Sequence, residues 1–329
     1  MAEYRGIQGA AVQSRTASTG LLEGEIWYKS DDGTFRLQAL ASAAWATGGA
    51  LTGARQSGGI TGLQTAALQA GGYPGANTTT MTYDGSTWTA PGNNLNTGRY
   101  IAAIWGTQTA AVCATGSASG PPYTGTTAAE EFNGTSWTAS NPINTARYGC
   151  FAGGTLTQGV VAGGSGPATY ADDVEEYDGT SFSTVTSIPS DQGNGTSGAY
   201  TQTDVMCVGG GPGNKTTNSH YNGTSWTSLN GLSGDGRRGT GGALNSSTAP
   251  GFTTGGETAT TNPITLTEEW DGTSFSTSTA LPTATRDLAS AGGGTGYAGI
   301  VAGGFNTAAT TNTFEYTGVQ VGSKTITTS

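Results

Sequence analysis

Few side chains in this sequence have the chemistry for catalysis or metal binding. The chain holds one histidine, His220, so it cannot build a copper or zinc site that needs several histidine or cysteine ligands close together. Adjacent acids recur as Glu130-Glu131, Glu175-Glu176 and Glu268-Glu269. Neighbours on a strand point to opposite faces, so these pairs do not converge as two catalytic carboxylates must. We expect His220 to be a strand residue that takes the place of one such glutamate.

Arginines recur as well, and a cluster of arginines could bind a carboxylate or a sugar. They are Arg55, Arg99, Arg147, Arg237 and Arg286, each ten or eleven residues after an aromatic side chain. A side chain repeated in this way is spread around a symmetric structure, whereas catalytic groups gather at one asymmetric place. We therefore expect a structural role for these arginines, and we expect no catalytic residue, no metal site and no cofactor.

The elements that position these side chains form an internal repeat. Its central phrase begins at residues 83, 132, 177, 221 and 270, as YDGSTWT, FNGTSWT, YDGTSFS, YNGTSWT and WDGTSFS. Asp-Gly and Asn-Gly predict a hairpin in which both residues occupy the central, positive-φ positions of the turn. Each copy also has two short apolar runs and a small residue followed by Gly. Four short strands in about 47 residues predict one blade of a β-propeller.

The chain ends indicate how many blades there are. The aromatic residue that closes the phrase recurs as Trp45, Trp88, Trp137, Phe182, Trp226 and Phe275. Trp45 precedes the first full copy, and the last copy lacks such a strand. We expect an all-β fold in which residues 39–329 form a six-bladed propeller, closed by pairing of the Trp45 strand with the C-terminal strands. Closure removes two exposed sheet edges.

Residues 1–38 lie outside this repeat. The stretch GEIWYKSDDGTFRLQ alternates apolar and polar residues around an Asp-Gly turn, so we expect an arm followed by a small hairpin. Such an arm adds a strand to another subunit or is a disordered terminus. The candidate attachment residues are Tyr4, Arg5, Ile7, Trp27 and Tyr28.

The loops after the small-Gly pairs differ most between repeats, and loops are where propellers carry specific contacts. Symmetry places these loops on one face. Tyr73, Tyr123 and Tyr170 in them are candidates for contact with a protein partner or a glycan, or are ordinary exposed loop residues.

Composition narrows the classes of partner. The 329 residues include 57 glycines, charged residues make up 10%, and the formal net charge is −10. This charge disfavours nucleic acid and anionic membranes. No apolar run reaches the roughly 18 residues of a transmembrane helix, and we expect no signal peptide and synthesis in the host cytoplasm.

The motifs together resemble known families. The Gly pairs, the aromatic residue before Asp-Gly and the Trp strand resemble the kelch repeat of β-propellers. GIQGAAVQS, GEIWYKSDDGTFRL, TAALQAGG and YDGSTWT together resemble the kelch-like propeller proteins of marine tailed phages, including cyanophages, over nearly the whole chain. This resemblance implies a structural protein of the virion, in the tail or its fibres.

We therefore expect a non-enzymatic virion protein that binds other tail or capsid proteins through residues 1–38, as a homo-oligomer in the particle. A host-glycan-binding adhesin is the alternative. A capsid decoration protein and a glycosidase are further, less favoured alternatives. Neither nucleic acid nor membrane insertion is expected.

Overall fold

The computed structural model describes residues 13–15, 26–31, 33–120, 123–166, 170–198, 201–290 and 297–325. These residues form 28 strands and no helix, and hence none that could cross a membrane. The chain divides into two compact units. One is Ala44–Gly318, and the other combines Met1–Ala43 with Val319–Ser329.

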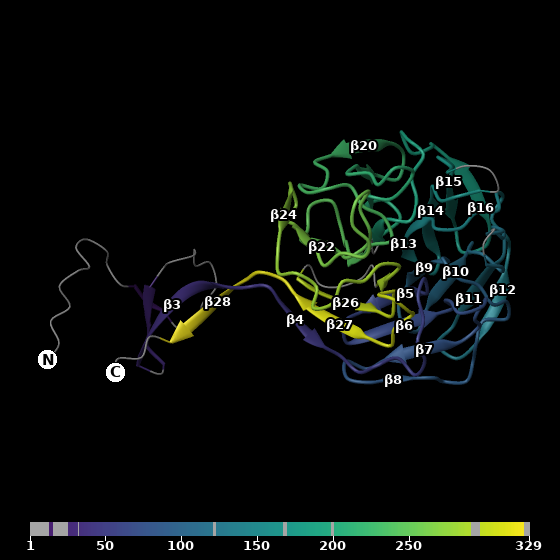
Figure 1. The fold of residues 1–329 in the computed structure, drawn as a ribbon. Coiled ribbons are helices and arrows are strands. Elements are labelled where there is room, and N and C mark those ends of the chain that lie inside the picture. Colours follow the sequence, from purple (N-terminus) through teal and green to yellow (C-terminus); the bar gives the residue numbers. More distant parts are fainter. Residues whose placement is uncertain are drawn as a thin grey trace, which may run out of the picture. The chain divides into compact units, whose positions relative to one another are not determined.

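The larger unit is a six-bladed β-propeller, in which each blade is a four-stranded antiparallel sheet (Figure 1). The strands of blades 1 to 3 are, in order, β5 (Gly59–Leu63), β6 (Ala66–Ala70), β7 (Thr80–Tyr83) and β8 (Trp88–Thr89); β9 (Ala103–Gly106), β10 (Ala111–Ala114), β11 (Ala129–Phe132) and β12 (Trp137–Ser140); and β13 (Phe151–Thr155), β14 (Gln158–Ala162), β15 (Val174–Tyr177) and β16 (Phe182–Val185).

Blades 4 to 6 follow the same order. Their strands are β17 (Thr196–Gly198), β18 (Val205–Val208), β19 (Asn218–Tyr221) and β20 (Trp226–Leu229); β21 (Gly241–Ala243), β22 (Gly251–Thr254), β23 (Thr267–Trp270) and β24 (Phe275–Thr277); and β25 (Ala289–Ser290), β26 (Ala298–Ala302), β27 (Thr313–Thr317) and β4 (Ala44–Thr47). The first strands of neighbouring blades contact one another around the axis.

The ring closes as the sequence predicts. Strand β4, from the N-terminal side of the chain, pairs antiparallel with β27, and Trp45 lies opposite Tyr316. Blade 6 therefore combines both ends of the repeat region, which leaves no blade with an unpaired fourth strand. The predicted all-β, six-bladed propeller is confirmed.

The repeated phrase forms the outer hairpin of each blade, but its turn differs from the prediction. In YDGSTWT, Tyr83 pairs with Trp88, and the N–H of Asp84 donates to the Thr87 carbonyl, so Gly85 and Ser86 are the two central residues. Gly85 has φ +92°, as a type II′ turn requires at its first central position. Asp84 precedes the turn, and its carboxylate accepts the N–H groups of Ser86 and Thr87, both at 2.8 Å.

Each outer hairpin holds a pair of aromatic rings in tilted contact. The ring centroids lie 4.6–5.0 Å apart in all six blades. The pairs are Tyr316–Trp45, Tyr83–Trp88, Phe132–Trp137, Tyr177–Phe182, Tyr221–Trp226 and Trp270–Phe275. Several indoles also bond the preceding blade; for example, Trp137 Nε1 donates to Thr80 Oγ1 at 2.8 Å. The predicted aromatic residues thus hold the hairpins and join the blades.

Small residues allow the blades to pack closely. Trp105 of blade 2 lies against β14 of blade 3, and its Nε1 donates to the Thr155 carbonyl at 3.0 Å. A Cβ atom at Gly159 would lie 2.3 Å from that same Nε1 atom. Glycine at this position therefore lets the indole pack directly against the neighbouring strand.

The smaller unit is a sheet made from both ends of the chain. Its order is β1 (Gln13–Arg15), β2 (Ile26–Lys29), β3 (Thr34–Ala41) and β28 (Gln320–Thr325). Strands β2 and β3 form the predicted hairpin, whereas β28 pairs antiparallel along β3. The predicted boundary between residues 38 and 39 therefore shifts to 43/44, and Val319 onward leaves the propeller. No local turn links β3 to β28, so the sequence gives no signal for this pairing.

The predicted attachment residues are only partly visible in this unit. Trp27 and Tyr28 lie on β2, where Trp27 is buried and Tyr28 contacts the exposed Phe35 at a centroid distance of 5.4 Å. Tyr4, Arg5 and Ile7 lie outside the described residues. Trp27 therefore contributes to the core of its own sheet.

Candidate functional site

Three of the five repeated arginines form buried ion pairs within a blade. Arg147 is fully buried; its Nη2 lies 2.9 Å from Glu175 Oε1, and its Nη1 donates to the Gly163 carbonyl at 3.0 Å. Arg99 pairs with Glu130 at 2.5 Å, and Arg237 pairs with Glu268. Each of these glutamates also accepts N–H groups of the linker that enters its blade, as Glu175 does from Asn144 at 2.7 Å. The arginines therefore fix the linkers to the blades.

Both partners are replaced in two of the other three blades. Blade 4 has Gln192 and Ser219 at the two positions, and blade 6 has Thr285 and Phe314, as strand register and the shared linker bonds show. In blade 1, where Met81 replaces the glutamate, Arg55 donates to Gln69 Oε1 at 3.1 Å instead. A charged residue is thus not left buried without a partner, which supports the predicted structural role.

Arg286 is an exception that corrects the predicted set. In each repeat the N–H of the second residue of the small-Gly pair donates to a carbonyl of the next linker. That carbonyl belongs to Arg99, Arg147 and Arg237 in their linkers, but to Thr285 in the linker that contains Arg286. Arg286 is therefore one position later, equivalent to Arg238. The spacing of ten or eleven residues from the aromatic could not distinguish these positions. Arg286 is half-buried and stacks over the ring of Phe305, 4.7 Å from its centroid.

The second acid of each pair bonds the next blade. Glu131 accepts the hydroxyl of Tyr177, and Glu176 accepts that of Tyr221 at 2.9 Å. The first and second acids therefore point in different directions, as predicted. His220 occupies the position of this second acid, as predicted too, and its Nε2 lies 2.8 Å from Asp204 Oδ1.

A closed ring of backbone hydrogen bonds surrounds the propeller axis. In the linker that enters each blade, one residue donates its N–H to the carbonyl of the equivalent residue of the preceding blade, at 2.6–2.9 Å. The six residues have φ between +52° and +65°. They are Ser57, Ile101, Gly149, Asn194, Gly239 and Asp287. Because positive φ is costly for a residue such as Ile101, the surrounding blades must hold this ring in place.

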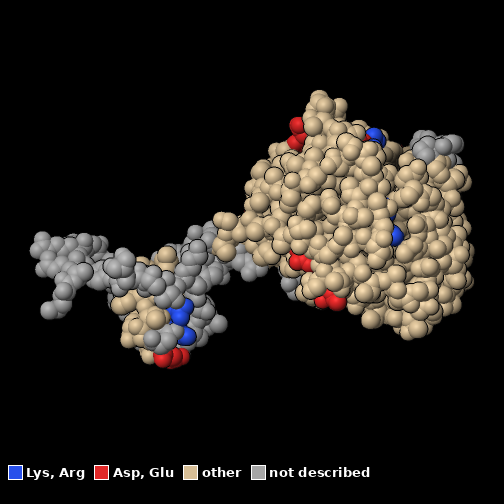
Figure 2. Space-filling view, turned by 60° about the horizontal axis from the view of Figure 1, so that its bottom comes forward, with Lys and Arg blue, Asp and Glu red and all other residues tan. Residues whose placement is uncertain are grey.

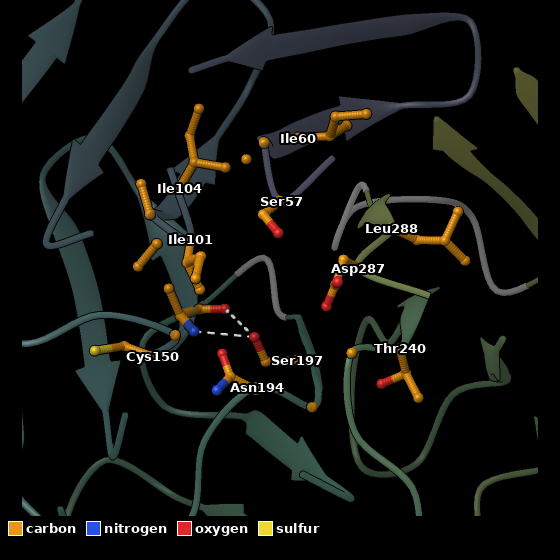
Figure 3. Close-up of a pocket in the computed structure, with 18 residues that line it drawn as sticks. Ser57, Ile60, Ile101, Ile104, Cys150, Asn194, Ser197, Thr240, Asp287 and Leu288 are labelled. Atoms are coloured by element: carbon orange, nitrogen blue, oxygen red, sulfur yellow. Dashed lines mark hydrogen bonds between the residues drawn. The ribbon is translucent and has the colours of Figure 1, made fainter. Parts of the chain in front are cut away.

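The ring lies between two axial cavities, and all its residues except Gly149 line both of them. The inner cavity is small, about 120 Å³, and is lined largely by glycine, alanine and other small residues. Figure 3 shows the hydroxyl of Ser57 and the carboxylate of Asp287 pointing into it. Gly149 makes room for a ring neighbour, since a Cβ there would lie 2.0 Å from Asn194 Oδ1. The other cavity is a funnel of about 510 Å³, a size typical of small-molecule sites.

Tyrosines form one wall of the funnel. Tyr73, Tyr100, Tyr123 and Tyr148 follow one another with ring centroids 5.3–5.9 Å apart. Tyr73 and Tyr123 are about 40% exposed, whereas Tyr100 is buried between them. Tyr170 also lines the funnel, and Asn194 Nδ2 donates to its hydroxyl at 3.4 Å. The structure thus brings together all three predicted loop tyrosines.

Charged side chains form the opposite wall. Arg238 Nε lies 2.7 Å from Glu257 Oε1, and Arg286 Nη1 lies 2.7 Å from Asp287 Oδ2. Glu257 also faces Arg286, with 3.7 Å between Oε2 and Nε. These four residues are the charged groups among the described funnel lining, so the wall carries two positive and two negative charges. Charged side chains are sparse on the propeller face seen in Figure 2.

The surroundings of Asp287 and Arg238 shift the pKa values of both side chains. Burial raises the pKa of the Asp287 carboxyl, although Arg286 beside it acts in the opposite direction. The hydrogen bond to Glu257 raises the pKa of the Arg238 guanidinium. The funnel therefore offers a firmly charged donor, Arg238, next to an acceptor, together with an aromatic surface.

Sequence reasoning found part of this site and missed the rest. It selected Tyr73, Tyr123 and Tyr170 because their loops vary between repeats. It missed the position directly after the linker arginine, which contributes Tyr100, Tyr148 and Arg238 to the funnel. That position is Gln56, Tyr100, Tyr148, Gly193, Arg238 and Arg286 in the six repeats. The variation of this position within an otherwise regular repeat could have indicated that it belongs to the site.

The described residues contain no group of three or more His, Cys, Asp or Glu side chains placed to hold a metal ion. Cys113, Cys150 and Cys207 are free thiols, and burial raises the pKa of each. Cys113 and Cys207 lie in the cores between blades, as expected of small apolar residues.

No family model and no curated protein matches the chain. Among solved structures, that of YjhT matches with a TM-score of 0.67 and 13% sequence identity, covering 83% of this chain and 99% of YjhT. At this identity the likeness shows the fold alone. The chain is thus similar to YjhT in its β-propeller fold.

Proposed function

We propose that the protein is a non-enzymatic component of a phage virion, in the tail or a tail fibre. In this proposal the small sheet attaches the chain to other virion proteins, and the funnel of the propeller binds a molecule on the host surface. The leader GEIWYKSDDGTFRL, which resembles phage propeller proteins, supports the virion assignment, and it forms the β2–β3 hairpin of the small sheet.

The observation that carries the binding role is the difference between blades in the funnel. The aromatic pairs recur in all six blades, and the arginine–glutamate pairs recur in three. In the funnel, equivalent positions instead carry Tyr100 and Tyr148 on one side and Arg238 and Arg286 on the other. The aromatic pairs that hold the outer hairpins are kept in all six blades, so the fold by itself does not account for this difference in the funnel. A binding site for one asymmetric ligand requires such a difference.

The pairing of the funnel carboxylates supports binding over catalysis. Glu257 faces two guanidinium groups, and Asp287 bonds Arg286. A carboxylate held in this way is well placed to accept hydroxyl groups, and less suited to transfer a proton. Asp287, with its raised pKa, is the residue on which a hydrolytic alternative would depend.

Two measurements test the proposal. Mass spectrometry of purified particles should detect the protein, and its absence would refute the virion assignment. The purified protein, added to host cells beforehand, should slow phage adsorption. Tyr123→Ala should lose this inhibition, whereas Tyr297→Ala should keep it, because Tyr297 is equally exposed but lies outside the funnel. Turnover of a host polysaccharide that Asp287→Asn abolishes would instead support an enzyme.

A further inference from the structure

We infer that the funnel binds one terminal, uncharged sugar residue of a glycan, inserted end-on toward the axial ring. This inference rests on the proposed function, because it names the chemical class of the ligand that the funnel would take. It is carried by the chemistry of the two walls, by the balance of charge in the funnel, and by the shape of the axial cavities.

The two walls match the two kinds of surface on a sugar ring. One face of a pyranose presents C–H groups, which pack well on the face of an aromatic ring. Tyr73 and Tyr123 provide exposed aromatic surface, and the buried Tyr100 supports both through edge-on contacts. The hydroxyl groups of a sugar each donate and accept hydrogen bonds. Across the funnel, Arg238 and Glu257 offer a donor and an acceptor side by side.

The charges favour an uncharged ligand. The two arginines and two acids of the funnel balance, and Glu257 already faces both guanidinium groups. A sugar carboxylate would have to displace Glu257 from an arginine and then lie near two acids. The net charge of −10 adds long-range repulsion against an anionic glycan. Neutral hydroxyl groups meet none of these obstacles.

The shape favours end-on insertion. The funnel volume of about 510 Å³ falls to about 120 Å³ beyond the ring, below the range of roughly 300–1,000 Å³ typical of ligand sites. Six backbone hydrogen bonds hold the ring, so the passage is not free to widen locally. A glycan chain therefore enters by its terminal residue and stops at the ring.

The test is saturation-transfer NMR and calorimetry on the full-length protein with methyl glycosides of glucose, galactose, mannose and N-acetylglucosamine. The methyl glycosides of glucuronic and galacturonic acid serve as matched charged probes. We expect at least one neutral glycoside to bind, with affinity changing less than about twofold between low and high salt. Its charged counterpart should bind more weakly. Tyr123→Ala should weaken binding roughly tenfold through loss of the stacking surface, Tyr123→Phe should retain it, and Tyr297→Ala should have no effect.

Tighter binding of the uronic acids, or binding that Tyr123→Ala leaves unchanged, would overturn the inference. Failure of every neutral glycoside to bind would overturn it as well. In that last case the proposed function would still stand if Tyr123→Ala abolished the inhibition of phage adsorption, because the host ligand would then belong to another class. If Tyr123→Ala changed neither measurement, both the sugar inference and the binding role of the funnel would fail, whereas the virion assignment is decided by mass spectrometry of the particles.

Discussion

The structural role of the linker arginines predicts a specific pattern of stability changes at Arg147 and Glu175. Both side chains are fully buried, and Glu175 also accepts three hydrogen bonds from Asn144 and Thr145. Arg147→Gln leaves a buried carboxylate without its cation, which we expect to cost about 3–5 kcal/mol. Glu175→Ser leaves the guanidinium without its anion and should cost a similar amount.

The double variant should cost much less than the sum of the two. It reproduces the pair that blade 4 already contains, in which Gln192 Nε2 donates to the Gly209 carbonyl at 2.6 Å and Ser219 replaces the glutamate. No buried charge then remains without a partner. We expect a coupling energy of about 2 kcal/mol or more, since the two residues are in direct contact.

Denaturant unfolding and calorimetry of the four proteins provide the assay. Each single variant should lower Tm by roughly 6–10 °C, at about 2 °C per kcal/mol for a domain of this size. Inhibition of phage adsorption should be unchanged in folded samples. Additive costs, or single variants that keep their stability but lose adsorption, would show that Arg147 acts in binding and would refute the reasoning.

Four further predictions address packing, pH and the smaller unit. Gly159→Ala places a Cβ against the Trp105 indole and should cost about 1–3 kcal/mol in denaturant unfolding, whereas Gly53→Ala, which meets only ordinary contacts, should stay within about 0.5 kcal/mol. Backbone N–H groups lower the pKa values of Asp84, Asp178 and Asp271. These carboxylates therefore stabilise the fold above the unfolded-state pKa of about 4, and this stabilisation is lost as pH falls through the lower folded-state pKa values. An acid titration in which Asp84→Asn unfolds at the same pH as the unchanged protein would contradict this. Burial and a nearby glutamate raise the pKa of Tyr83 and of Tyr177 to about 12. The free energy of unfolding should therefore fall as pH rises from about 10 to 12. Ultraviolet absorbance should show phenolate forming together with unfolding rather than before it. Truncation after Val319 removes β28 and should leave the main melting transition of the propeller unchanged while abolishing incorporation into particles; normal incorporation would contradict the attachment role of the small sheet.

The fold was largely predictable because its determinants are local and repeated. The Asp-Gly and Asn-Gly hairpins, the closing aromatic residues and the unmatched Trp45 together specify six blades and their closure. The pairing of β28 with β3 was not predictable, since it joins segments far apart in the chain without a connecting turn. The same limit applies to the axial ring, whose bonds join residues from six different repeats.

The site was predictable only in part. Tyr73, Tyr123 and Tyr170 lie in loops of unequal length, so their difference from the repeat is visible in the sequence. Arg286 was assigned to the wrong position, because the arginine follows the aromatic residue by ten or eleven residues in the sister repeats, and both Thr285 and Arg286 fit that spacing. Tyr100 and Tyr148 resemble ordinary aromatic residues at the start of a strand, and only the geometry of the linkers directs them toward the axis.

The most direct test of the central claim, that the axial funnel is the binding site, is hydroxyl-radical footprinting of the protein with and without host-cell envelope. Bound envelope should protect Tyr73, Tyr123 and Tyr148, while Tyr297, which is as exposed as Tyr73 and Tyr123 but lies outside the funnel, should react as in the free protein. Protection of Tyr297 or of the outer hairpins, with unchanged reactivity of the funnel tyrosines, would contradict it.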